Sequence, residues 1–212
     1  MTNGAKYLKG GIVLLDDAGT VVRALPMLVN PASLQHSFEV KSMGEETGRS
    51  SPLRLTGPAV ETISFEARME VSDALARGDA VAIDEGIRPQ LAALQMLVTP
   101  TTAMLDANDA LQKSGALEIV PMTQPLSLFI WGRTQIIPFR LVAFSYTEEF
   151  FNARLYPLAA TVQMTLRALS VDDLGYSSRG GAIYRAYLRN IEASAARVAN
   201  TQLATLGIEG AL

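Results

Sequence analysis

The chain has 212 residues, of which 49% are hydrophobic and 18% charged, and its net charge is −3 at pH 7. This length fits one domain, or one domain with an appendage. The absence of cysteine excludes disulfides and thiolate metal sites, the acidic balance argues against nucleic acid as a partner, and no apolar run reaches the roughly 18 residues of a membrane-spanning helix.

The chain is apolar for a freely soluble monomer, with a mean hydropathy of +0.19. Two interpretations are open: the surplus apolar surface covers other subunits, or it fills a large core. The N-terminal segment Met1 to Lys9 has no apolar stretch of the kind that secretory signals contain, so we expect synthesis in the cytoplasm.

The first elements in chain order are strands. Ile12 to Leu15 and Thr20 to Leu25 flank turn residues at Asp16 to Gly19, which predicts a hairpin. After Asn30-Pro31 has interrupted the pattern, Leu34 to Lys41 resumes it, with Phe38 and Val40 expected on one face.

A polar loop is expected over Ser42 to Pro52, and loops of this length are often functional. Leu53 to Leu55 then returns to the sheet, and Val60 to Val71 alternates strictly between apolar and polar residues. This alternation predicts a long strand with one face on a core and one face toward polar surroundings.

The middle of the chain changes to a helical pattern. Arg88-Pro89 is typical of a first helical turn, and apolar residues follow at helical spacing as far as Pro100. A second short helix is expected over Met104 to Lys113. Leu126 to Trp131 and Ile136 to Tyr146 then predict a hairpin, whose second strand we expect to be buried on both faces.

The last part combines a strand with a long helix. Pro157 to Leu174 contains the second strictly alternating stretch, so it predicts another strand with a polar face. Tyr176 to Leu206 has an apolar stripe at helical spacing, and Gly207 suits the position after a helix. This helix either packs on its own domain or docks on a partner.

Residues with catalytic chemistry are few and unfavourably placed. His36 is the one histidine of the chain, and we expect a structural role for it on a strand face. The acidic pairs Asp16-Asp17, Glu148-Glu149 and Asp172-Asp173 lie at turns or point to opposite strand faces. We therefore expect no catalytic, cofactor-binding or metal-binding residues, and no enzyme activity.

Two further features have alternative interpretations. Trp131 is either a core anchor or an interface anchor, with the core favoured. The arginines of the last helix form either a solvated face or a surface that docks on an acidic protein; they are Arg179, Arg185, Arg189 and Arg197.

A series of short motifs in a fixed order suggests a family. They are Val29-Asn30-Pro31, Ser37 to Val40, Leu53 to Gly57, Glu61 to Glu66, Pro125 to Gly132, Leu141 to Glu148 and Phe151 to Val162. The series resembles the tube-protein family of contractile injection systems, in particular the tube–baseplate adaptor, or tube initiator, of phage-tail-like particles. The likeness covers roughly Lys9 to Asp173.

The resemblance implies a mainly β (α+β) fold. Residues 1–174 would form a β-barrel of two packed antiparallel sheets with a flanking helix. Residues 175–212, which the likeness does not cover, are expected to form a C-terminal helical extension. Six copies would form a ring that lines a channel, joins the inner tube to the spike and baseplate, and templates tube assembly. The loop over Ser42 to Pro52 would reach a neighbouring ring or subunit.

The partners implied are further copies of the chain, the inner tube protein, and spike and baseplate proteins, without nucleic acid or membrane. Assembly would occur in the cytoplasm, into a particle that is released or envelope-anchored. Adaptors of this group often end in a LysM-type module, which this chain does not resemble. The alternatives are the main inner-tube subunit, a β-barrel that binds a small ligand, and an enzyme of unfamiliar type.

Overall fold

The computed structural model describes residues 8–42, 54–113 and 124–198. The strands are β1 (Gly11–Leu15), β2 (Val21–Pro26), β3 (Gln35–Glu39), β4 (Val60–Glu70), β5 (Leu126–Trp131), β6 (Gln135–Phe151) and β7 (Pro157–Ala168). The helices are α1 (Ser72–Ala76), α2 (Ala80–Glu85), α3 (Arg88–Gln95), α4 (Thr102–Lys113), α5 (Val171–Leu174) and α6 (Arg179–Ala195). The mainly β class is confirmed.

The strands form one seven-stranded antiparallel sheet in the order β2-β1-β5-β6-β7-β4-β3. Within the described ranges, β2 and β3 are the edges, so the sheet is not closed into a barrel. The resemblance implied two packed sheets, whereas the strands form a single sheet. The two halves form one sheet because β6 is 17 residues long and extends through both. Its first part pairs with β5 and the remainder with β7, so the ladder runs unbroken between the two halves.

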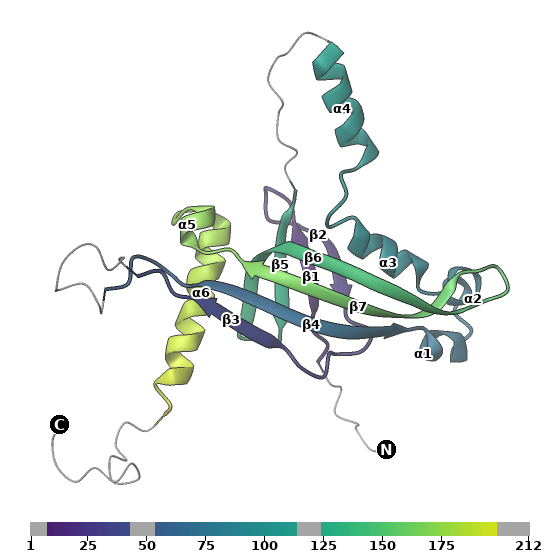
Figure 1. Cartoon of the computed structure of the whole chain (residues 1–212), viewed down its shortest axis with the longest axis horizontal. Helices are drawn as coiled ribbons and strands as arrows, with labels where there is room; N and C mark the ends of the chain where they lie inside the picture. Colours follow the sequence, from purple (N-terminus) through teal and green to yellow (C-terminus); the bar gives the residue numbers. More distant parts are fainter. Residues whose placement is uncertain (1–7, 43–53, 114–123, 199–212) are drawn as a thin grey trace.

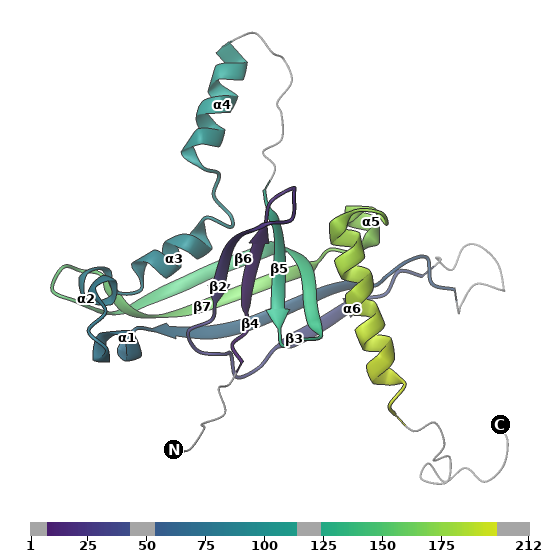
Figure 2. The same cartoon turned by 180° about the vertical axis from the view of Figure 1, so that it is seen from behind.

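The halves of this sheet cross each other, with β1, β2 and β5 running across the direction of β4 and β7 (Figures 1 and 2). Strand bends of this kind let one sheet enclose a core between crossed layers. Phe65 of β4 and Phe129 of β5 stack there with ring centroids 5.6 Å apart. The alternation predicted for β4 and β7 is confirmed, since Ile63, Val162 and Leu166 are buried.

A bulge in β6 changes which residues face this core. The register with β7 shifts between Leu141 and Ala143, so Phe144 continues the core face while Ala143 joins the opposite face. Val142 is 57% exposed. The expectation that this strand is buried on both faces was therefore wrong.

The helices cover the two open ends of the core. Around α3, Ile87, Leu91 and Leu94 belong to the core cluster at one end, while α6 lies across the other (Figure 1). The helix predicted at Arg88-Pro89 is confirmed, with proline in its first turn. The sequence analysis missed α1 and α2.

The C-terminal helix packs back on its own sheet. Tyr184 and Tyr187 of α6 are buried in the core cluster, and Asn190 donates a hydrogen bond to the Thr134 carbonyl at 2.9 Å. The helix ends at Ala195 rather than near Leu206. Residue 207 lies outside the described ranges.

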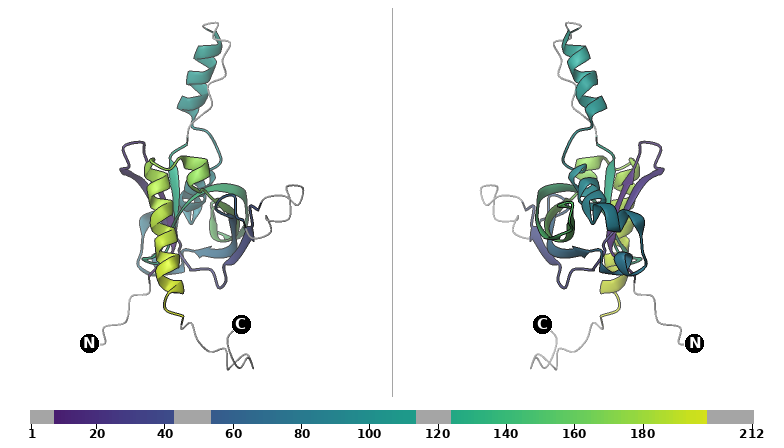
Figure 3. Two further views of the ribbon diagram at one scale, coloured as in Figure 1. Left: turned by 90° about the vertical axis from the view of Figure 1, so that its left-hand side faces the viewer. Right: turned by 90° about the vertical axis from the view of Figure 1, so that its right-hand side faces the viewer.

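In contrast, α4 stands away from the body of the protein (Figure 3), and none of its residues is buried. Over the described ranges, no helix combines the length and apolarity needed to cross a membrane.

Candidate assembly surfaces

The outer side of β3, β4, β6 and β7 is a continuous polar surface, which we call the polar face. Its side chains are hydroxyls, amides and a few charges that alternate with the buried core residues. They are Gln35, Ser37, Thr62, Ser64, Glu66, Arg68, Ser145, Thr147, Glu149, Thr161, Gln163 and Thr165. The predicted polar side of β4 and β7 is thus one side of a four-strand surface.

Hydrogen bonds between neighbouring strands order this polar face. Gln163 donates to Glu66 at 3.0 Å, and Thr161 donates to Glu149 at 2.9 Å. Arg68 also donates to Glu149, at 3.1 Å. Arg68 offsets the charge of Glu149, while Glu66 has the neutral Gln163 as its partner, so the face is hydrophilic with few charges.

An exposed apolar group lies where the β6–β7 hairpin meets α2, and we call it the tip patch. Its members are Ile83, Phe150, Phe151 and Leu155, which are each more than half exposed. Exposed apolar clusters of this kind mark interaction surfaces in soluble proteins.

The backbone at the tip patch is strained and firmly held. Phe150 and Leu155 have φ values of 54° and 63°, in the left-handed region that side chains disfavour. The Asn152 side chain accepts hydrogen bonds from two backbone N–H groups of the turn, and Arg154 forms an ion pair with Asp84 at 3.0 Å. Strain of this kind concentrates at functional surfaces.

A second exposed apolar group, the edge patch, lies along the free edge at β3. It consists of Phe38, Val40 and Leu55, with exposures of 57%, 61% and 72%. Ser42 and Leu55 form an isolated bridge beside it. The loop predicted over residues 42–52 lies outside the described ranges from residue 43 onward.

The predicted structural histidine belongs to a cluster around a buried carboxylate. Glu61 is 4% exposed, and its Oε1 lies 2.8 Å from His36 Nδ1. The Tyr187 hydroxyl is 3.2 and 3.1 Å from the two carboxylate oxygens. Burial, and then the nearby Glu61 charge, raise the pKa of Tyr187 above its usual range. The cluster therefore joins α6 to β3 and β4.

The predicted acidic pairs do not form a site. Glu148 lies 3.9 Å from Arg88, whereas Glu149 pairs with Arg68 at 3.1 Å. Adjacent strand residues thus serve opposite faces, as expected.

The other two acidic pairs lie at a turn and at the start of a helix. Asp172 pairs with Lys41 and Asp173 with Arg167, each at 2.9 Å. Asp16 accepts a hydrogen bond from a backbone N–H of its own turn at 2.7 Å. No group of histidine or acidic residues suited to a metal ion occurs in the described part of the chain.

Sequence reasoning missed the capping box that starts α5. Ser170 and Asp173 cap each other's backbone N–H groups, and the Ser-x-x-Asp spacing was the available signal. Burial opposes ionisation of Asp173, but hydrogen bonds from the Ser170 backbone and Arg167 outweigh burial and lower the pKa below 3.8.

Trp131 and the arginines are in part structural. Trp131 packs against the core and lies parallel to Phe129 with centroids 6.1 Å apart, which confirms the core anchor. Arg179 donates to the Ala18 carbonyl, and the Arg185 guanidinium lies 4.1 Å from the centre of the Tyr176 ring.

No protein-family model matches the chain, and no curated protein matches it. Solved structures similar to part of it include the tail of an empty gene transfer agent particle, refined with C6 symmetry, at 13% identity. The TM-score is 0.31, and the match covers 80% of this chain and 95% of that one. A native gene transfer agent virion gives 11% identity and a TM-score of 0.28, with the same coverage. TM-scores of this size do not establish a shared fold.

Proposed function

We propose that this protein is a structural, non-enzymatic subunit of a contractile injection particle. Six copies would form a ring that joins the inner tube to the spike and baseplate and serves as the template for the first tube ring. The observation that carries the proposal is the polar face: a four-strand hydrophilic surface backed directly by the core.

The polar face has the properties that a water-filled channel wall requires. Its central residues are mainly hydroxyls and amides, Arg68 pairs with Glu149, and the Glu66 carboxylate accepts a hydrogen bond from Gln163. A wall of this kind binds neither the apolar groups nor the charged groups of a passing molecule strongly. The order of the sequence motifs that resemble the tube-protein family supports the same role.

The boundaries of the sheet supply the means of joining copies. Among the described residues, β2 and β3 each have a neighbouring strand on one side only, and such edges form templates for pairing with another chain. The edge patch and the tip patch add apolar area at separate places. Two different patches on one subunit suit a head-to-tail contact, which closes into a ring.

The second candidate is the main inner-tube subunit. The polar face supports it equally well, but α4 stands out from the body of the protein (Figure 1) and α6 adds a helix to the sheet. A protein that stacks on itself many times has to accommodate α4 at every ring, so we favour the adaptor.

Counting copies in purified particles tests the proposal. Quantitative mass spectrometry of contractile particles from the producing cell would measure this chain against the sheath and spike proteins. One or two rings' worth is expected for an adaptor, and a copy number equal to that of the sheath would identify the tube subunit. Absence from the particles would refute both assignments.

A further inference from the structure

The C-terminal helix carries positive charge that its own domain leaves unpaired. Its cations, with one in the turn after it, are Arg179, Arg185, Arg189 and Arg197. Glu192 is the single acidic residue between positions 179 and 198. Over the described ranges, none of these arginines forms an ion pair, and the two acids of α5 are already paired with Lys41 and Arg167. The surface around α6 is therefore basic.

The segment from α1 through α2 carries the opposite charge. Its anions are Asp73, Asp79, Asp84 and Glu85. Arg77 is the single basic residue between positions 72 and 86. Arg154 of the β6–β7 hairpin pairs with Asp84, whereas Asp73 and Glu85 form no ion pair with any residue that the structure describes. The surface around α2 is therefore acidic.

These two charged surfaces lie at opposite ends of the long strands (Figures 1 and 2). β4 is 11 residues long, which separates its two ends by about 35 Å. Its first residues pair with β3 and contact α6 through the hydrogen bond between Glu61 and Tyr187. Its last residue is followed closely by α1. One subunit therefore has two ends of unlike charge.

Each charged surface adjoins exposed apolar side chains. Ile191 of α6 is 45% exposed, and the edge patch lies at the same end, since its strand β3 is joined to α6 by the cluster around Glu61. At the other end, Ile83 of the tip patch is 53% exposed and lies on α2 beside Asp84 and Glu85. Apolar groups surrounded by polar and charged ones are typical of protein–protein interfaces.

We propose that α6 of one copy docks on α2 and the tip patch of a second copy, with the arginines of α6 opposite the acids of α2. Opposite charges at the two ends favour this head-to-tail contact, whereas two like ends repel each other. A contact between two different surfaces repeats around a ring. The inference deepens the proposed function, on which it rests, by naming the two surfaces that join neighbouring copies.

Chemical cross-linking tests the contact in the full chain, which contains no cysteine. Ile191→Cys and Ile83→Cys would be prepared separately, one of them labelled with ¹⁵N, then mixed in equal amounts and linked with a short bis-maleimide. Mass spectrometry of the linked peptides distinguishes the mixed dimer from each homodimer. We expect the mixed dimer to exceed each homodimer at least tenfold, because like ends repel.

Charge reversal tests what drives the contact. Glu85→Arg in the Ile83→Cys chain should lower the yield of mixed dimer several-fold, and Arg189→Glu in the Ile191→Cys chain should then restore it. Asp106→Arg is the matched control, because Asp106 lies on the projecting helix α4. Thermal unfolding would show that each variant is folded.

The possible results separate this contact from its alternatives. A mixed dimer at the statistical proportion would leave the arginines to solvent or to another protein and overturn the proposal. An excess of either homodimer would identify a contact between like ends and overturn it too, as would a yield that Glu85→Arg changes no more than Asp106→Arg does. None of these results alters the copy number in particles, so failure of the contact and failure of the proposed function are distinguishable.

Discussion

Glu61 shows how a single charge is accommodated inside this protein. Its carboxylate oxygens accept hydrogen bonds from the Tyr187 hydroxyl and contact His36, so the buried charge is satisfied from two other elements. Because the raised pKa of Tyr187 keeps its hydroxyl protonated, the donor stays in place at all ordinary pH values.

Removal of that donor should destabilise the fold. We expect Tyr187→Phe to lower the free energy of unfolding in urea by about 1–3 kcal/mol, because the buried carboxylate loses a partner. Tyr184→Phe is the matched control: Tyr184 is a buried neighbour on the same helix whose hydroxyl bonds to none of the described residues. An equal loss in both variants would contradict this role for Glu61.

Asp173 gives a prediction of pH dependence. Its folded pKa is below the ordinary value of 3.8. The stability it contributes is therefore complete above that value and is lost as the pH falls through the folded pKa.

Asp173→Asn should unfold more easily than the natural chain at pH 7, by about 1 kcal/mol as for other helix caps. The difference should shrink at pH 3. Urea denaturation at both values measures it, with Asp109→Asn as control because its pair with Lys113 is exposed and such pairs contribute little. A difference independent of pH would contradict the prediction.

At the scale of elements, the β6–β7 hairpin combines strain with exposed apolar side chains. Phe150 holds a φ of 54° and is 67% exposed as a residue, so neither the backbone nor burial favours phenylalanine there. Such a residue is retained at a cost in stability when its side chain acts outside the chain.

Phe150→Gly should therefore separate stability from assembly. We expect the free energy of unfolding of the isolated chain to stay equal or rise by about 1 kcal/mol, because glycine relieves the left-handed strain. Incorporation into particles, measured by mass spectrometry, should fall. A destabilised chain with normal incorporation would show that the ring serves the fold of its own subunit.

At the scale of the whole molecule, the tip patch should join neighbouring copies. Leu155 is 79% exposed, so Leu155→Arg should leave the thermal unfolding of the isolated chain unchanged. The amount of this protein in purified particles should fall at least tenfold, because a charge would be buried in the contact.

Val198→Arg makes the same chemical change at a residue that is 72% exposed, next to the end of α6. If this control is incorporated normally and the Leu155→Arg variant is not, the contact is assigned to the tip patch. Normal incorporation of both variants would exclude Leu155 from any subunit contact.

Local pattern by itself determined most of the elements. Alternation predicted β4 and β7 with their buried and polar faces, and turn residues predicted the β1–β2 and β5–β6 hairpins. Both depend on interactions between residues near in sequence, or on a period of two that any half-buried strand shows. The polar face could be foreseen strand by strand for the same reason.

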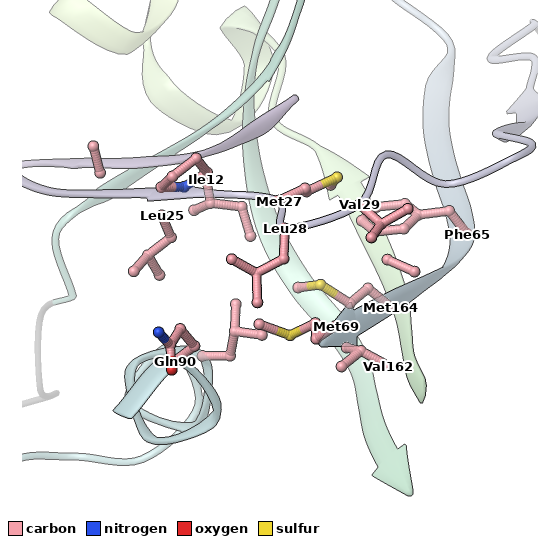
Figure 4. A pocket seen from close by; sticks show the side chains of 14 residues that line it. Ile12, Leu25, Met27, Leu28, Val29, Phe65, Met69, Gln90, Val162 and Met164 are labelled. Carbon is pink, nitrogen blue, oxygen red and sulfur yellow. The ribbon is translucent and has the colours of Figure 1, made fainter. Parts of the chain in front are cut away.

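The tertiary structure alone decided what depends on distant contacts. The pairing of β6 with both β5 and β7 joins the two halves into one sheet. The bulge before Ala143 moves Phe144 to the core face, and Tyr187 reaches Glu61 across 126 positions of sequence. The apolar hollow between β2 and α3 (Figure 4) arises between crossed layers. These features depend on how surfaces pack in three dimensions, and a local sequence pattern does not predict that packing.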